Sequence, residues 1–228
     1  MISLLCPTRY RPQLALKLYQ TFQDTQDGKN ELIFCLQKED PKIKQYLEVF
    51  KAKNITNFFI SESMPTSYLW NQMALQAKGD LMTLIGDDVE ILTQGWDTKI
   101  EDAANKIQDN IFVLTVDDGR RDKPQGQHMR CPHPTMHRKW LETLGYFVPP
   151  FFMHRYLDTY TQSLALKLNR FIELPDVVFN HLKFNHSNDD TGVRSRNWLN
   201  YDRYVYERIS SRYFNEDLKL LESKLFPN

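Results

Sequence analysis

The first 85 residues of the chain alternate between short apolar runs and helical stripes, and this alternation constrains the fold more than any other sequence feature. Four apolar runs have the length of buried strands and occupy residues 1–6, 31–36, 55–60 and 81–85. Between them, apolar side chains recur at helical spacing, most clearly at Ile43, Tyr46, Leu47 and Phe50. Strands and helices that alternate at these lengths predict an α/β protein with a largely parallel sheet covered by helices on both faces.

The remainder of the chain is less regular. We expect helices at 96–108, 140–144 and 157–168, and strands at 111–116, 171–174 and 177–179. Pro175 separates the last two strands, because proline has no N–H for a sheet ladder. Two further helices follow Trp198. A chain of 228 residues can form one sizeable domain, so we expect a domain over residues 1–186, with a lid loop and a helical extension over residues 187–228 packed on it.

Charge and cysteine content narrow the class of protein. Lysine plus arginine equals aspartate plus glutamate, 29 against 29, so no overall field attracts nucleic acid or an anionic membrane. The short apolar start lacks a basic leader, and no later apolar run reaches the length of a membrane span, which predicts a soluble cytoplasmic protein. Cys6, Cys35 and Cys131 are odd in number and widely spaced, so we expect buried free thiols in a reducing compartment.

The fourth apolar run ends on two adjacent carboxylates, Asp87 and Asp88. In an open α/β sheet, ligands bind in the crevice outside the carboxyl ends of the strands, so acids at that place suit metal and phosphate chemistry. A pair of aspartates after a strand is also ordinary turn chemistry. The order of the surrounding elements favours the metal site.

Five motifs follow one another between residue 2 and about residue 186. They are Ile2-Ser-Leu-Leu-Cys-Pro7-Thr8-Arg9-Tyr10-Arg11-Pro12, Glu31-Leu-Ile-Phe-Cys-Leu-Gln37-Lys-Glu-Asp40-Pro41, residues 71–80, Gly86-Asp87-Asp88, and Leu144-Gly145-Tyr146-Phe147 followed by Asp158. Their order and spacing resemble the GT-A fold of nucleotide-sugar glycosyltransferases, particularly family 2 and its compact bacterial and bacteriophage relatives. The resemblance implies a Rossmann-like, mostly parallel sheet flanked by helices, with a helical C-terminal extension. It also implies a metal-dependent hexosyl- or pentosyltransferase that moves a sugar from a nucleotide diphosphate to an acceptor hydroxyl with inversion.

The first two motifs resemble the family's nucleotide site. Pro7, Thr8 and Arg11 correspond to the first nucleotide-binding loop, where N–H groups at a helix start and a guanidinium approach the nucleoside and diphosphate. The alternative is a plain strand-to-helix turn opened by the following proline. Gln37 and Asp40 lie where the family places an acid that reads the base. Glutamine departs from that pattern, although its amide can pair with a uracil edge, and a UDP-sugar is the donor we expect.

The acidic pair resembles the DxD-type motif that holds Mg²⁺ or Mn²⁺ in this family. The resemblance makes Asp88 the direct ligand and places Asp87 near the ribose or a metal-bound water. Hard cations prefer carboxylate and phosphate oxygen, and they neutralise charge on a departing diphosphate. His181 and His186 follow the last strand, where several members supply a histidine that favours Mn²⁺, and we select His181. The alternative is a structural hydrogen bond.

Asp158 follows Gly145-Tyr146-Phe147 as the family's acidic base follows its equivalent segment. A carboxylate there can take the proton of an acceptor hydroxyl while that oxygen attacks the anomeric carbon opposite the diphosphate. The alternative is an aspartate that stabilises the N-terminus of the helix at 157–168. We expect a glycan or another hydroxyl compound as acceptor, modified phage DNA included. The competing functions are a non-catalytic nucleotide-sugar binding protein and a sugar nucleotidyltransferase.

The irregular half contains three further candidate groups. A tetrahedral zinc site, whose spacing matches no standard structural pattern, would use His128, Cys131, His133 and His137. The stretch from Asp189 to Arg196 is either a lid whose arginines close over the diphosphate or a solvated loop. A basic concentration, which either faces an anionic acceptor or is solvated, consists of Arg120, Arg121, Lys123, Arg130, Arg138 and Lys139.

Overall fold

The elements up to residue 84 alternate between strand and helix in the computed structural model, which describes residues 1–62, 64–120, 127–182 and 190–225. They are β1 (Ile2–Thr8), α1 (Pro12–Thr25), β2 (Glu31–Gln37), α2 (Ile43–Ala52), β3 (Phe58–Ser61), α3 (Thr66–Gln76) and β4 (Leu81–Leu84). The predicted alternation is confirmed. Strands β2 and β4 flank β1, β3 flanks β2, and all three of these pairs are parallel.

The second half of the chain completes a mixed sheet. Its elements are β5 (Val89–Ile91), α4 (Trp96–Ala104), β6 (Val113–Asp117), β7 (Thr135–His137), α5 (Arg138–Leu144), α6 (Leu157–Lys167), β8 (Phe171–His181), α7 (Asp190–Arg208) and α8 (Ser210–Glu222). Among the described residues, eight strands form one sheet in the order β3-β2-β1-β4-β7-β6-β8-β5. The β7 strand runs antiparallel to both β4 and β6, and β5 runs antiparallel to β8, whereas β6 and β8 are parallel.

Three predictions about the strands were wrong. Strands β5 and β7 were not predicted, because they have three residues each and are too short to show a period. The single strand β8 was predicted as two strands divided at Pro175. The pairing with β6 jumps there, from Leu174 opposite Val116 to Val178 opposite Asp117. This irregularity accommodates Pro175, because the skipped residues need no ladder hydrogen bond.

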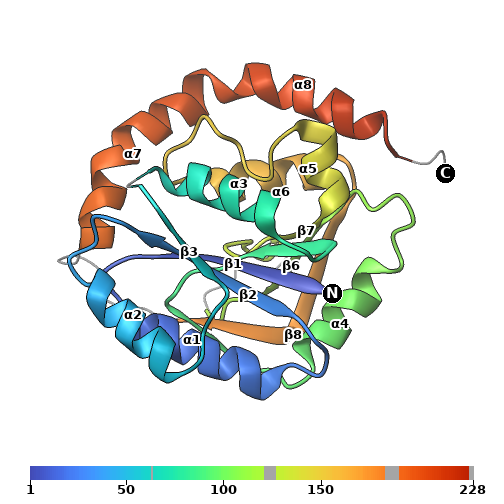
Figure 1. Ribbon diagram of the computed structural model, residues 1–228. Helices are drawn as coiled ribbons and strands as arrows, with labels where there is room; N and C mark the ends of the chain where they lie inside the picture. The colour runs from blue at the N-terminus through green and yellow to red at the C-terminus, as the bar shows by residue number, and fades with distance from the viewer. Residues whose placement is uncertain (63, 121–126, 183–189, 226–228) are drawn as a thin grey trace.

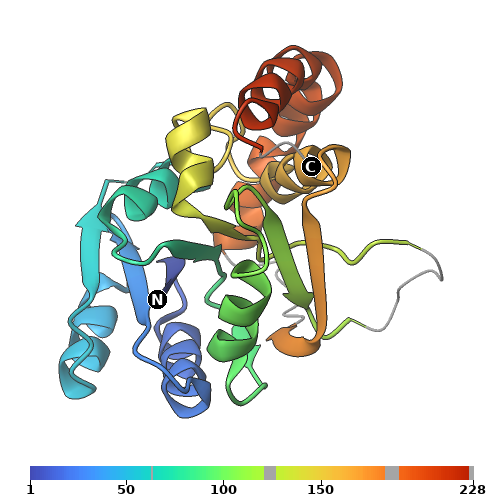
Figure 2. The ribbon, with the colours of Figure 1, turned by 90° about the vertical axis from the view of Figure 1, so that its right-hand side faces the viewer.

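Alternate side chains of the strands enter two separate cores on the two faces of the sheet. In β1, Leu4 and Cys6 join the core that includes residues of α1, α2 and α4, whereas Leu5 joins the core that includes residues of α3, α5 and α6. Figures 1 and 2 show these two layers of helices on opposite sides of the sheet. The predicted covering of both faces is confirmed, and Cys6, Cys35 and Cys131 are buried free thiols as predicted.

The last two helices pack on the second core. They run outside α3, α5 and α6, forming the outer arc of Figure 1. Val205 of α7 and Leu221 of α8 are buried in this core. Asp217 of α8 accepts hydrogen bonds from the hydroxyls of Tyr146 and Tyr160. Both helices were predicted, although α7 begins eight residues earlier than the predicted start at Trp198.

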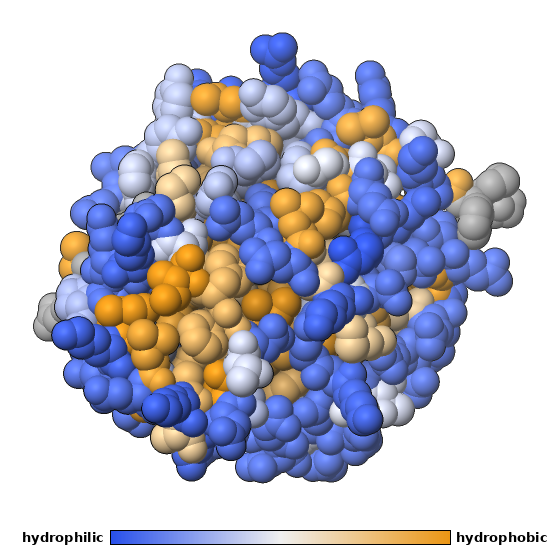
Figure 3. Space-filling view, viewed as in Figure 1, coloured by the Kyte–Doolittle hydropathy of each residue, from blue (hydrophilic) through white to orange (hydrophobic). Residues whose placement is uncertain are grey.

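Strand β3 is one of the two terminal strands of the sheet, and apolar surface lies near it. Figure 3 shows apolar surface on this face between α2 and α3. Leu47 of α2, Ile60 of β3 and Leu75 of α3 are exposed. Within the described residues, no helix has both the length and the apolar character needed to cross a bilayer.

Candidate active site

One large cavity, of about 1070 Å³, lies at the carboxyl ends of β1 and β4. Its wall is completed by the loop before β7, the start of α6, the end of β8 and the first half of α7. Most of the predicted site residues line this cavity, namely Pro7, Thr8, Arg11, Gln37, Asp87, Asp88, Asp158 and His181. Asp40 is the exception. The fold therefore brings predicted side chains from five separate segments of the sequence to one place.

The first loop is fixed by a hydrogen-bond chain that ends on the acidic pair. The Thr8 hydroxyl donates to Asp87 Oδ2 at 2.6 Å, and the Tyr46 hydroxyl lies 2.7 Å from Thr8 Oγ1. Since the proton of Thr8 is committed to Asp87, the Tyr46 hydroxyl donates to Thr8. The Tyr46 oxygen in turn accepts the backbone N–H of Arg11 at 2.9 Å. Tyr46, which the sequence analysis treated only as core, thus holds the loop to α2.

The two carboxylates sit in different electrostatic environments. Arg11 Nη1 lies 3.1 Å from Asp87 Oδ1 and 3.6 Å from Asp88 Oδ2. Burial raises the pKa of Asp87 to about 6, against the opposing effect of the Arg11 charge. Burial also acts to raise the pKa of Asp88, but the hydrogen bond and charge of His181, with Arg11, outweigh it and lower the pKa to about 2. Asp88 is therefore ionised throughout the physiological range.

His181 and Gly86 complete the surroundings of Asp88. His181 Nε2 lies 3.4 Å from Asp88 Oδ2, so the predicted partner from the end of β8 reaches the acidic pair. Gly86 leaves room for the Asp88 carboxylate, because a Cβ at residue 86 would lie 2.5 Å from Asp88 Oδ1. This role of Gly86 was not predicted from the sequence. A glycine directly before two acids was the available signal.

His133 lies behind His181 and was not predicted for this place. The two imidazole rings have centroids 5.2 Å apart. His133 is buried, and burial, with the nearby His181, lowers its pKa to about 3. Within the described residues, neither His133 Nε2 nor His181 Nδ1 has a hydrogen-bond partner. His133 is therefore neutral and places no positive charge beside the acidic pair.

The proposed zinc residues are not gathered. His137 caps the N-terminus of α5, where its Nδ1 accepts the N–H of Lys139 at 3.0 Å. His128 Nδ1 lies 3.6 Å from Glu173 Oε2. Among the described residues, no group of three or more histidine, cysteine, aspartate or glutamate side chains could hold a metal by itself.

Gln37 and Asp40 have different positions relative to the cavity. Gln37 lines it, and its Oε1 accepts a hydrogen bond from Arg9 Nη1 at 3.2 Å. Asp40 is buried behind the loop, where its two carboxylate oxygens accept the N–H groups of Tyr10 and Lys42, each at 2.8 Å. Asp40 thus joins the loop after β1 to the loop after β2. Its predicted contact with a nucleotide stays a prediction.

Asp158 enters the cavity from the first turn of α6. The residue before this helix is Tyr156, so Asp158 is its second residue rather than its cap. Burial raises the pKa of the Asp158 carboxyl, against weaker lowering by local N–H groups, by the Thr159 hydroxyl 3.5 Å away and by Arg155. A carboxylate with a raised pKa is a better proton acceptor than an ordinary one.

The predicted basic concentration is divided between two places. Arg120 and Arg130 line the cavity, and their Nε atoms lie 3.6 and 3.8 Å from Asp118 Oδ2. Arg138 is elsewhere, where it donates to the backbone carbonyls of Ala77 and Gly79 at 2.6 and 2.8 Å. Arg121 and Lys123 lie outside the described residues.

The predicted lid is described in part. His186 and Asp189 lie outside the described residues, and the chain is helical from Asp190 onward. Arg196 and Trp198 of α7 line the cavity.

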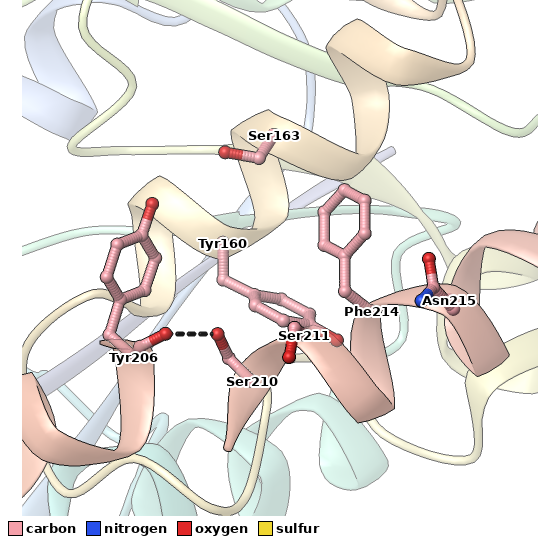
Figure 4. Close-up of a pocket in the computed structure, with 7 residues that line it drawn as sticks. All are labelled: Tyr160, Ser163, Tyr206, Ser210, Ser211, Phe214 and Asn215. Carbon is pink, nitrogen blue, oxygen red and sulfur yellow. Dashed lines mark hydrogen bonds between the residues drawn. The ribbon is translucent and has the colours of Figure 1, made fainter. Parts of the chain in front are cut away.

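A smaller pocket of about 320 Å³, shown in Figure 4, lies between α6, α7 and α8. It is lined by Tyr160, Ser163, Tyr206, Ser210, Ser211, Phe214 and Asn215.

Comparison with known proteins identifies the fold. No protein-family model and no curated protein sequence matches the chain. Among solved structures, the mannosyltransferase PcManGT from Pyrobaculum calidifontis, in complex with GDP-Man and Mn²⁺, superposes with a TM-score of 0.64 over 98% of this chain and 73% of that one, at 12% identity. The chain has a GT-A glycosyltransferase fold. The GT-A fold was predicted from the five motifs, and that prediction is confirmed.

Two more structures with the GT-A fold extend the comparison. S. aureus TarS 1-349 in complex with UDP-GlcNAc has a TM-score of 0.60 at 14% identity, over 98% of this chain and 72% of that one. Glucosyl-3-phosphoglycerate synthase from Mycobacterium tuberculosis, with Mg²⁺ and UDP, has a TM-score of 0.59 at 11% identity, over 86% and 76%. The chain spans 59% of another TarS 1-349 structure and 43% of a further TarS structure. Identities this low concern the fold alone.

Proposed function

We propose that the protein is a metal-dependent glycosyltransferase that moves a sugar from a nucleotide-diphosphate donor to an acceptor hydroxyl with inversion. The observation that carries the proposal is one shared cavity. An ionised Asp88, in contact with His181 and Arg11, and a carboxylate of raised pKa, Asp158, both line it. Such a transfer requires one carboxylate that binds the cation and a second carboxylate that accepts the proton of the acceptor hydroxyl.

The donor site in this proposal is the wall formed by β1 and β4. The Arg11 guanidinium, 10% exposed, can contact diphosphate oxygens, and Pro7 and Thr8 flank it. Gln37 offers an amide to the base, and Asp87 holds the loop through Thr8 and Arg11 while lying near the expected ribose. A UDP-sugar is our first candidate donor, with hexosyl and pentosyl groups equally open. Solved structures of this fold contain UDP, UDP-GlcNAc or GDP-Man.

The side chains present fit a cation that arrives with the nucleotide. Asp88 and His181 offer one ionised oxygen ligand and one imidazole, and the remaining positions would belong to phosphate oxygens and water. Bound Mn²⁺ or Mg²⁺ would neutralise charge that develops on the departing diphosphate. The imidazole favours Mn²⁺. Asp88 is proposed as the direct ligand because its pKa is the lower of the pair.

The chemical step uses Asp158 as general base. Its carboxylate accepts the proton of the acceptor hydroxyl, the hydroxyl oxygen forms a bond to the anomeric carbon, and the bond from that carbon to the diphosphate breaks on the opposite face. The configuration at the carbon inverts as a result. The acceptor in this proposal is a glycan or another hydroxyl compound, and hydroxylated phage DNA is one candidate. We further propose a cytoplasmic location, which suits three free thiols.

A donor panel with three variants tests the proposal. UDP-glucose, UDP-GlcNAc and GDP-mannose are each titrated with Mn²⁺ while the melting temperature and release of nucleoside diphosphate are measured. One donor should raise the melting temperature and be turned over. Asp88→Ala should abolish Mn²⁺-dependent binding, whereas Asp80→Ala, at the other end of β4, should not. Asp158→Asn should keep binding and lower turnover by roughly a hundredfold to ten-thousandfold.

The outcomes separate the competing functions. Binding without turnover by the unmodified protein would indicate a nucleotide-sugar binding protein. Release of pyrophosphate from a nucleoside triphosphate and a sugar phosphate would indicate a nucleotidyltransferase. Unchanged Mn²⁺-dependent binding by folded Asp88→Ala would remove Asp88 from the metal site.

A further inference from the structure

Asp202, in α7, joins the C-terminal extension to the loop that precedes the proposed base. Its side chain is fully buried, with 0% exposure. Oδ1 accepts the N–H of Met153 at 2.7 Å, and Oδ2 accepts the N–H groups of His154 and Arg155 at 3.0 and 2.8 Å. We propose that Asp202 is a positioning residue for the transfer reaction, because it fixes the backbone that sets the place of Asp158. The proposal rests on the function proposed above.

The three N–H groups require a carboxylate. They are consecutive in the chain and donate to one side chain, so Asp202 takes the place of the backbone carbonyls that would accept them in a helix or strand. A carboxylate has two oxygens with about four acceptor positions, whereas an amide has one oxygen and a hydroxyl also donates. Without these donors, a buried carboxylate in α7 would be strongly unfavourable. Loop and helix therefore stabilise each other only in this arrangement.

The fixed loop forms a wall of the active site. Met153 to Thr159 all line the large cavity, so a shift of the backbone at residues 153–155 moves the wall that carries Asp158. Tyr156 lies between residues 153–155 and Asp158 and has φ +66, a left-handed conformation that residues other than glycine adopt rarely. Such a conformation persists only where the surroundings hold it. Asp202 supplies part of that restraint.

A second contact from the same helix supports the loop. The ring of Tyr206, one turn after Asp202 in α7, stacks on the ring of Tyr156 with centroids 4.6 Å apart and planes inclined by 15°. Figure 4 shows Tyr206 leaving α7 beside Tyr160 of α6, while the Ser210 hydroxyl donates to the Tyr206 carbonyl at 2.5 Å. One helical turn of α7 thus holds both the amides and the ring of the loop.

The loop is also attached on its other side, at the start of α3. The Thr66 N–H donates to the Met153 carbonyl at 2.9 Å, and the Ser67 hydroxyl donates to the Phe152 carbonyl at 2.5 Å. Loss of the Asp202 contacts should therefore loosen the loop without releasing it. This predicts a folded variant with a displaced Asp158, rather than an unfolded protein.

The variant Asp202→Asn tests the proposal, because its amide nitrogen would face N–H donors and could not accept from them. Hydrogen exchange at the amides of residues 153–155 should become faster by about tenfold. Turnover of the active donor should fall by about tenfold to a hundredfold, because a small displacement of the base is costly. The dissociation constants for Mn²⁺ and UDP should change by less than about twofold, because the donor wall belongs to β1 and β4.

The matched control is Asp217→Asn, which also removes a buried carboxylate from the extension. Within the part of the chain that the structure describes, Asp217 accepts from the hydroxyls of Tyr146 and Tyr160 and from no backbone N–H of the loop, so this variant should melt at a lower temperature with normal turnover and normal exchange at residues 153–155. Equal losses of turnover in the two variants, or unchanged exchange in Asp202→Asn, would overturn the proposal.

Two further outcomes are decisive. If Asp202→Asn fails to fold, Tyr206→Leu, which removes only the ring stack on Tyr156, should show the same pattern with a smaller loss of turnover. Normal turnover in a folded Tyr206→Leu with loosened amides would contradict the proposal. If the unmodified protein turns over no donor at all, the proposed function fails, and the positioning role fails with it, whereas the exchange data still report whether Asp202 holds the loop.

Discussion

At the scale of single residues, Asp87 and Asp88 are chain neighbours that hold their protons over different pH ranges. Asp87 is buried under Thr8 and Arg11 and has a pKa of about 6, whereas Asp88, beside His181, has a pKa of about 2. Both pKa values lie below 7, so the contacts of the two acids, rather than their charge at neutral pH, give them different roles. Asp88 keeps an ionised oxygen toward the cavity, and Asp87 makes the loop rigid.

The raised pKa of Asp87 should appear in the stability of the metal-free protein. A carboxyl with a higher pKa in the folded state stabilises folding below the unfolded pKa of 3.8, and this contribution is lost as the pH rises through about 6. A shift of about two units corresponds to about 3 kcal/mol. In EDTA, the unmodified protein should therefore lose about 3 kcal/mol of unfolding free energy relative to Asp87→Asn between about pH 4 and pH 7. Denaturant titrations at several pH values measure this, and a constant difference would contradict it.

At the scale of elements, the segment between α5 and α6 is held by side chains from helices rather than by its own backbone pairing. Asn71 of α3 accepts the N–H groups of Phe147 and Val148 at 2.7 and 3.1 Å and donates to the Val148 carbonyl at 2.9 Å. Phe147 and Val148 are buried, so these groups have no access to water. Asn71 thus replaces the sheet ladder that this segment lacks.

Replacement of Asn71 should therefore destabilise the protein strongly. Asn71→Ala leaves two buried N–H groups and one carbonyl without partners, and the unfolding free energy should fall by about 3 kcal/mol. Asn71→Asp keeps the accepting oxygen and should lose less. Chemical denaturation of both variants measures the difference, and an alanine variant within about 0.5 kcal/mol of the unmodified protein would show that the clamp is unimportant.

At the scale of the whole molecule, the C-terminal extension is part of the second core. Val205 and Leu221 are buried there with Trp140 of α5 and with Tyr160 and Leu164 of α6. Helix α7 also supplies Arg196 and Trp198 to the large cavity. The extension therefore supports both stability and the site.

A chain that ends at residue 189 should lose its native packing. Each large side chain uncovered costs about 1.5–3 kcal/mol, and a domain has only about 5–15 kcal/mol of stability. We expect binding of a hydrophobic dye and loss of the near-ultraviolet circular dichroism signal. A chain that ends at Leu225 serves as the control and should retain both native properties. A native spectrum for the shorter chain would show that residues 1–189 fold alone.

The local pattern of the sequence carries much of this structure. Apolar runs predicted strands β1, β2 and β4, and Pro12 marked the start of helix α1. The motif Gly86-Asp87-Asp88 predicted the acidic pair after β4. Each of these signals lies within a few neighbouring residues, so it can be read from a short stretch of the sequence. The GT-A fold followed from the order of such signals, and the comparisons confirmed it.

Long-range contacts decided the rest. The short strand β7 exists only because β4 and β6 pair with both of its edges. His133 contacts His181. Asp202 accepts hydrogen bonds from the loop before α6, from residues that precede it by 47 to 49 positions in the sequence. Local periodicity does not predict such contacts, because they stabilise the protein only after distant segments have packed together. The sequence by itself determined the order of the elements up to β4 and the place of the acidic pair, whereas the tertiary structure decided which side chains surround that pair and what holds the proposed base in the same cavity.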